Sequence, residues 1–210
     1  MPHLKGLEHG FHLSDPKQLQ FPVQLCLSTK LVPPAPNSFK LNFDGTAKGN
    51  PRRAGYGGVF RDEMGTIRHI YHGNIGNDTN NVAELEGIWK GIYIAEQENW
   101  YPLEVEGDSL IIIAAVIRIQ AGSPASKIAT SWILLSRLEQ MEEKLRTPRS
   151  ITFRHVRHTT NKVADRMANQ GVDQQILYFS GPLSDSNDEQ LENECTALAQ
   201  QDYSLQVEGG

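Results

Sequence analysis

The stretch FKLNFDG, residues 39–45, decides the fold because apolar and polar side chains alternate along it without a break. Phe39, Leu41 and Phe43 share one face, and Asp44 ends the polar face. A period of two predicts a β-strand with one buried face. An Asp-Gly pair at a strand end is also typical of a plain turn, so Asp44 alone does not establish a functional site.

The remaining pattern extends this strand into a layered domain. Two further strands are expected over residues 54–61 and 66–71, joined by the hairpin signal DEMG. The elements expected after them are a helix over 82–98, a strand over 103–106, helices over 109–119 and 126–146, a strand over 151–156, and a helix over 162–169 closed by Gly171. Three antiparallel strands followed by parallel additions predict an α/β fold with a mixed five-stranded sheet flanked by helices.

Composition divides the chain into three parts. Residues 1–37 lack sustained periodicity and end in a proline cluster, which predicts a flexible linker. Residues 38–173 carry the alternating elements and form the expected domain. Residues 174–210 are polar and acidic, which favours a solvated C-terminal tail, with room for a short helix near 191–200.

Charge follows the same division. The formal net charge is −5, but residues 1–37 and 38–175 each carry +1, and residues 176–210 carry −7. If metal ions neutralise four carboxylates of the central part, that part becomes basic, which suits a phosphate-bearing partner.

Several classes of protein are disfavoured. The longest apolar run, residues 110–117, is much shorter than the roughly 20 residues of a membrane span. The N-terminus shows no secretory signal. Cys26 and Cys195 lie far apart, which predicts a reducing, intracellular compartment, either nucleus or cytoplasm.

Four acidic residues carry the chemistry, although each has an ordinary structural explanation. Asp44 sits in the first strand, and Glu84 fits a capping box that begins at Asn81. Asp108 precedes Ser109 at a helix start, and Asp165 follows a capping asparagine, Asn161, onto a helix. In α/β sheets, however, the carboxyl ends of neighbouring strands form the usual site crevice. Four carboxylates meeting there would repel one another unless cations held them, and oxygen ligands suit Mg²⁺ or Mn²⁺.

The ordered motifs resemble type 1 ribonuclease H, especially the ribonuclease H domains of plant retrotransposon polymerases. The resemblance covers about residues 38–173. Its motifs are FDG at 43–45, GNP at 49–51, GYGG at 55–58, TNNxxE at 79–84, DS at 108–109 and NxxxD at 161–165.

The resemblance implies Mg²⁺-dependent hydrolysis of the RNA strand of an RNA–DNA hybrid. Asp44 would bridge two metal ions, with Glu84 and Asp108 on one side and Asp165 on the other. One ion would activate water, and the other would stabilise the leaving 3′ oxygen. Mn²⁺ is the expected substitute. His158, seven residues before Asp165, is the counterpart of a family histidine that assists proton transfer or product release, whereas His155 is expected to be structural or solvent-facing.

Substrate contacts also follow from the resemblance. The residues implied are Gly45, Asn50, Asn80, Asn81, Arg154 and Arg157. The asparagines match positions that touch the minor groove and the 2′-hydroxyls of RNA. They would satisfy turns and helix caps equally well. The arginines are the expected phosphate contacts.

Two main functional classes therefore remain after the sequence, beside a different nuclease on the same scaffold that acts on DNA or on double-stranded RNA. One is a monomeric hybrid ribonuclease that is tethered to, or derived from, a polymerase. The other is a catalytically silent module of the same fold that binds nucleic acid or a protein partner. The presence of all four carboxylates favours the enzyme.

Overall fold

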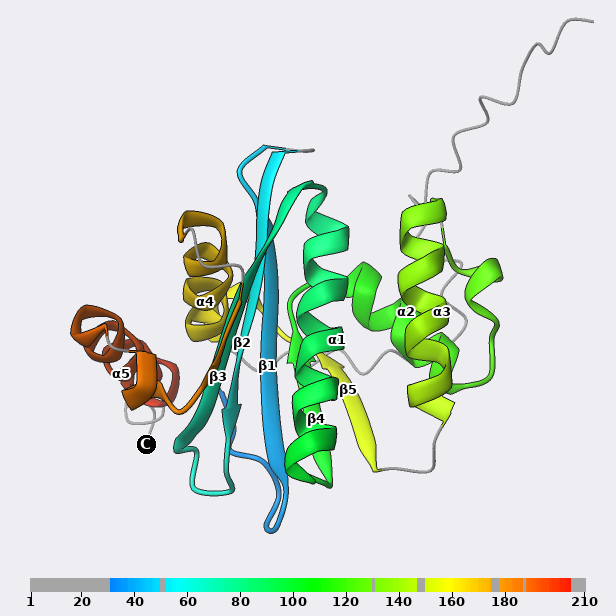
Figure 1. Ribbon diagram of the computed structural model, residues 1–210. Helices are drawn as coiled ribbons and strands as arrows, with labels where there is room; N and C mark the ends of the chain where they lie inside the picture. The colour runs from blue at the N-terminus through cyan, green and yellow to red at the C-terminus, as the bar shows by residue number, and fades with distance from the viewer. Residues whose placement is uncertain are drawn as a thin grey trace, which may run out of the picture.

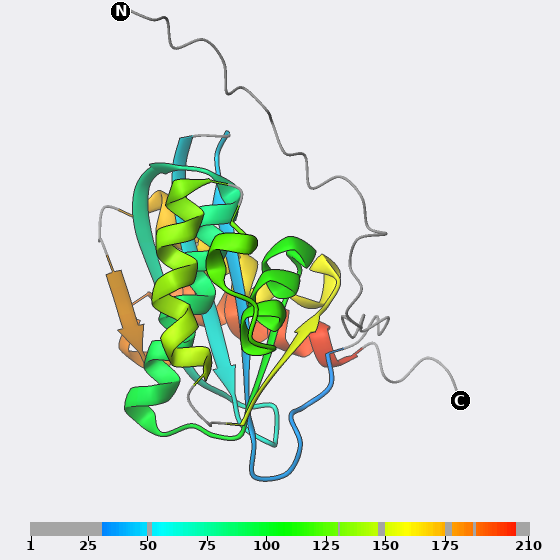
Figure 2. The ribbon, with the colours of Figure 1, turned by 90° about the vertical axis from the view of Figure 1, so that its right-hand side faces the viewer.

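A mixed sheet with helices on both faces makes up the protein, seen in a computed structural model (Figures 1 and 2). The structure describes residues 31–49, 52–129, 131–146, 150–174, 178–186 and 188–204. Within these ranges the strand order is β5-β4-β1-β2-β3-β6. Helices α1, α2 and α3 cover one face of the sheet, and α4 and α5 cover the other (Figure 1). The α/β class expected from the sequence is confirmed.

Strand pairing confirms the mixed sheet and adds one strand. The strands are β1 (Phe39–Ala47), β2 (Arg52–Arg61), β3 (Ile67–Asp78), β4 (Leu103–Gly107), β5 (Ile151–His155) and β6 (Tyr178–Gly181). β1, β2 and β3 pair antiparallel, whereas β4 lies parallel to β1 and β5 parallel to β4. β6 pairs antiparallel with β3, so the sheet has six strands rather than five. The four residues of β6, YFSG, do not alternate between apolar and polar, which is why the sequence did not predict this strand.

The helices differ from expectation mainly at their ends. The α-helices are α1 (Asn80–Glu98), α2 (Leu110–Gln120), α3 (Trp132–Arg146), α4 (Lys162–Asp173) and α5 (Glu189–Ser204). Short 3₁₀ turns are η2 (Ala125–Lys127), η3 (His158–Thr160) and η4 (Leu183–Ser186). The helix expected from residue 126 therefore begins only at Trp132.

Gly171 does not close the last helix of the central part, as the sequence suggested. It lies inside α4, which continues to Asp173. A Cβ atom at Gly171 would lie 2.4 Å from the carbonyl oxygen of Gly73 on β3. The glycine is therefore explained by the close approach of α4 to the sheet, since only a residue without a side chain fits there.

The face of β1 predicted to be apolar lies in the main core. Leu41 and Phe43 are fully buried and belong to one cluster with Leu85 and Ile88 of α1. The opposite face of β1 carries Asp44 together with other polar residues, so this one strand places a carboxylate directly behind the core. The alternation of residues 39–44 thus sets the face of the sheet on which the Asp44 side chain lies.

The described residues before β1 lie against the sheet. Lys40 donates from Nζ to the carbonyl oxygen of Val32 (2.6 Å) and pairs with Glu106 (2.6 Å). The backbone N–H of Ala35 donates to Glu104 (3.0 Å). The greater part of the predicted N-terminal linker, residues 1–30, lies outside the described residues. None of the described helices combines the length and apolar character that crossing a bilayer requires.

Part of the segment predicted as an acidic tail packs on the sheet and on α4. Leu191 and Cys195 of α5 are fully buried in a second apolar cluster. Its other buried members are Val59, Ile70, Val163 and Met167. Glu194 of α5 also pairs with Arg166 of α4 at 2.5 Å. The apolar side of α5 therefore adds a layer beyond residue 173, while the division of the chain into linker, domain and tail stays a prediction.

Because α5 packs on the rest of the domain, a substitution at its buried residue Leu191 should lower the stability of the protein. Truncation of Leu191 to alanine leaves a cavity among buried side chains and should lower the free energy of unfolding by about 2–5 kcal/mol. Urea denaturation followed by circular dichroism measures the change. Thr196→Ala, at an exposed position on the same helix, is the control and should change stability little. Equal stability of the Leu191 variant and the wild type would contradict the packing of α5.

Candidate metal centre

The first acidic residue, Asp44, lies inside a strand rather than in a turn. It pairs with Gly57 across β1 and β2, and its side chain is only 5% exposed. β1 also has β4 on its other side, so Asp44 sits near the middle of the sheet. The turn interpretation of the Asp-Gly pair is therefore wrong.

Glu84 reaches Asp44 from α1 because Gly45 lets the helix come very close. A Cβ atom on Gly45 would lie 2.0 Å from the backbone nitrogen of Glu84. The side chain of Thr79 caps α1 by accepting from the N–H of Val82 (3.4 Å). The predicted capping box at Asn81 is therefore wrong, and Glu84 lies in the second turn with its carboxylate buried.

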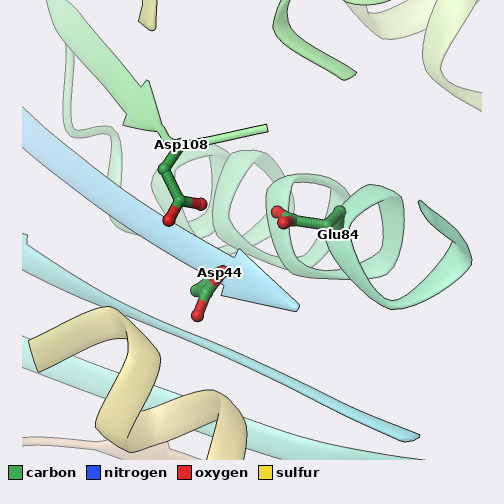
Figure 3. Close-up of side chains that lie close together, drawn as sticks. All are labelled: Asp44, Glu84 and Asp108. Atoms are coloured by element: carbon green, nitrogen blue, oxygen red, sulfur yellow. The ribbon is translucent and has the colours of Figure 1, made fainter. Parts of the chain in front are cut away.

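Asp108 comes from the carboxyl end of a neighbouring strand. It directly follows β4, which runs parallel to β1, and Ser109 caps α2 by accepting from the N–H of Ile112 (3.5 Å). Ser109 thus performs the capping, which leaves the carboxylate of Asp108 available to the site. One ligand atom from each of Asp44, Glu84 and Asp108 lies within 4.8 Å of the others (Figure 3).

Asp165 approaches this cluster from α4, on the sheet face opposite α1. It lies in the first turn of α4 and is half-buried. Its charge and a side-chain hydrogen bond act on Asp44 and raise the pKa of that residue. The predicted cap Asn161 makes no side-chain cap for α4; it donates from Nδ2 to the carbonyl oxygen of Phe43 (2.8 Å). Asp165 therefore lies next to Asp44, beside the cluster formed by Asp44, Glu84 and Asp108.

The carboxylates of the cluster lie close together and are partly or fully buried, which raises the pKa values of two of them. Burial, followed by the charges of Asp108 and Asp165, raises the pKa of Asp44 to about 8, although the backbone N–H of Gly45 opposes the shift. Burial and the charges of Asp44 and Asp108 raise the pKa of Glu84 well above its usual range. A cation among these oxygens would offset the burial and the charge repulsion that raise the pKa values of Asp44 and Glu84.

The donor set fits a hard divalent cation. All the donors are carboxylate oxygens, which Mg²⁺ and Mn²⁺ prefer. One oxygen of Glu84, Oε2, is buried and has no hydrogen-bond partner among the described residues. Buried polar atoms are normally satisfied, and a bound cation would satisfy this one.

Two histidines contact Asp108. His158 Nδ1 lies 2.9 Å from Asp108 Oδ2, and the side chain of His158 is 66% exposed. His155 Nε2 lies 3.0 Å from the backbone carbonyl oxygen of Asp108, which agrees with the structural role expected for it. The structure therefore brings the predicted proton-transfer residue to the outer edge of the acidic cluster.

The predicted substrate contacts are only partly gathered at the site. Asn80 is exposed and Asn81 half-exposed at the start of α1. Gly45 is buried beneath α1, where the close packing accounts for the glycine. Asn50 lies outside the described residues.

The two predicted arginines differ in their surroundings. Arg154 lies 3.5 Å from the carboxylate of Glu104, so its charge already has a partner within the protein. Arg157 is exposed beside His158, in the loop that leads to α4. Of the two, Arg157 is the better placed to meet a phosphate.

One polar residue near the site was missed by the sequence interpretation. Asn169 donates from Nδ2 to Asp165, both to its backbone oxygen (2.9 Å) and to Oδ1 (3.2 Å). The signal that could have found it is its spacing, because residues four apart on a helix face one another.

The chain is similar in sequence to the reverse transcriptase-like family and to proteins named ribonuclease H. The sequence profile of the reverse transcriptase-like family matches residues 42–171. The chain is 31% identical over 152 residues to an Arabidopsis thaliana protein named "putative ribonuclease H protein", covering 72% of this chain and 23% of that protein. It is 31% identical over 142 residues to ribonuclease HI of Streptomyces coelicolor, covering 61% and 59%. The chain thus spans less than two thirds of either relative.

A solved structure supports the same relationship. The ribonuclease H1 named LC11, crystallised with an RNA/DNA hybrid, is 27% identical and has a TM-score of 0.55. The match covers 65% of this chain and 97% of that chain.

The raised pKa values predict how stability depends on pH without metal. The folded-state pKa of Asp44, about 8, lies above its ordinary value of 3.8, so the folded protein binds this proton more tightly. The free energy of unfolding should therefore fall as pH rises from about 4 to 8. In EDTA, the melting temperature should be higher at pH 5 than at pH 8. Asp44→Asn should show a weaker dependence and greater stability at pH 8; identical pH profiles would contradict the shift.

Proposed function

The chain belongs to the reverse transcriptase-like family, and on that basis we propose that it hydrolyses the RNA strand of RNA–DNA hybrids. The carboxylate cluster carries the proposal. Asp44, Glu84, Asp108 and Asp165 all fall within the matched residues, and the first three share a site that can hold a metal ion. The hybrid bound by LC11 supports the same class of substrate.

The site would work through two divalent cations, with Mg²⁺ as the expected ion. Asp44, Glu84, Asp108 and Asp165 would supply the carboxylate oxygens that hold these ions. When bound, such ions activate water and stabilise charge on the reacting phosphate. The reaction adds a water oxygen to phosphorus and breaks the bond to the 3′ oxygen, leaving 5′-phosphate and 3′-hydroxyl ends. The protein contributes by holding the attacking water, the phosphorus and the leaving 3′ oxygen in line.

His158 is proposed to move a proton during this reaction. Its imidazole combines contact with Asp108 and exposure, so it can exchange protons between the site and solvent.

Recognition of the hybrid is proposed to use the start of α1 and the loop before α4. Asn80 and Asn81 present amide groups suited to 2′-hydroxyls, the groups that distinguish RNA from DNA. Arg157 would meet a phosphate. We propose that the domain acts as a monomer and is joined to, or derived from, a polymerase; the reverse transcriptase-like family match supports that link.

The central test is cleavage of a labelled RNA–DNA hybrid beside RNA–RNA and DNA–DNA duplexes, with and without Mg²⁺. The wild type should cut only the RNA of the hybrid. Asp108→Asn should lower the rate by about 10³-fold, because losing a ligand charge worth several kcal/mol has that effect. The matched control, Asp173→Asn, changes an exposed aspartate at the end of α4 and should keep the wild-type rate.

Failure of this test has a clear meaning. If folded wild type cuts no hybrid with Mg²⁺ or Mn²⁺ at low salt, the catalytic proposal is wrong. Binding of the hybrid without cleavage would then favour the silent module of the same fold.

Replacing His158 by alanine should lower kcat by about 10²-fold, the lower end of the range for a lost general acid or base. KM for the hybrid should stay close to that of the wild type because His158 is not assigned to binding. Single-turnover cleavage across a pH series measures both. An unchanged kcat at every pH would rule out the proton-transfer role.

A further inference from the structure

Asp165 differs from the other three acidic residues in how it reaches the site. Asp44 lies on β1, Asp108 directly follows the adjacent strand β4, and Glu84 lies on a helix packed directly on β1. Asp165 lies on α4, on the opposite face, and its side chain is partly exposed. A partly exposed aspartate on a helix can adopt more than one rotamer, so additional contacts are needed to aim its carboxylate at Asp44.

Asn169 supplies such a contact from the next turn of α4. Its amide nitrogen donates to Oδ1 of Asp165 at 3.2 Å and to the backbone oxygen of the same residue at 2.9 Å. The backbone contact fixes the amide group itself, so the second hydrogen bond has a defined direction. This arrangement holds one oxygen of Asp165 and leaves the other available to Asp44 and a cation.

Asn161 fixes the start of the same helix against β1. Its side chain is 1% exposed and donates from Nδ2 to the carbonyl oxygen of Phe43, the residue before Asp44. Its backbone oxygen accepts from the N–H of Asp165 at 3.0 Å. Asn161 thus connects the backbone at Asp44 with the backbone at Asp165.

We propose that Asn169 is a positioning residue that orients the carboxylate of Asp165 for metal binding, on a helix that Asn161 holds in register with Asp44. The proposal rests on the metal-dependent function above. Hydrogen bonds to a metal ligand fix its orientation, and their loss typically weakens metal binding by about 10–100-fold.

Metal binding without substrate provides the test. Isothermal titration of the full chain with Mn²⁺ and with Mg²⁺ should give an apparent Kd at least about tenfold higher for Asn169→Ala and Asn169→Leu than for the wild type. Asn169→Gln keeps an amide donor four residues from Asp165 and should recover most of the affinity. In cleavage assays at saturating metal, the KM of the alanine variant for hybrid should match that of the wild type.

A matched control separates positioning from a general effect of losing an asparagine. Asn193→Leu, at an exposed position on α5, should bind metal like the wild type. Unchanged metal affinity in both Asn169→Ala and Asn169→Leu, with active wild type, would overturn the positioning role and leave the proposed function intact. Wild type that neither binds divalent cations nor cuts hybrid would overturn the proposed function and this inference with it.

Discussion

Repulsion among buried carboxylates is the constraint on which the centre of this protein depends. Two unit charges about 4 Å apart repel by about 4 kcal/mol at an effective dielectric constant of 20. That is comparable with the whole stability of many domains, about 5–15 kcal/mol. Without metal, burial and then this repulsion raise the pKa values of Asp44 and Glu84. Divalent cations would offset both effects and leave the carboxylates ionised.

The surrounding structure keeps these charges close together despite that repulsion. β1 lies between β2 and β4; Asp44 pairs with Gly57 of β2, and the pairing with β4 ends two residues earlier, at Asn42. On one face α1 presses against Gly45, and on the other α4 is tied to Phe43 through Asn161. The strand pairing and the contacts of α1 and α4 therefore restrict movement of the backbone around the acidic site.

The sequence predicted much of this arrangement, and the failures have physical reasons. Alternation along β1 identified its buried face, and motif order identified the family and the four acidic residues. Residue patterns could not show that Gly45 serves helix packing, because a close approach depends on a distant element. The cap at Thr79 was missed because Asn81 and Glu84 also fit a capping box. Asn169 was missed because its role exists only once Asp165 is known to lie at the site.

The C-terminal layer has a consequence for how molecules of this protein meet. Without β6, the long strand β3 would offer unpaired backbone N–H and C=O groups to any extended chain. β6 pairs with Ile70 to Gly73, four of the twelve residues of β3, and its own outer edge is only four residues long. Short edges are poor templates for strand addition, so we expect β6 to reduce edge-to-edge association between copies. An acidic segment that looks dispensable by composition thus helps keep the molecules apart.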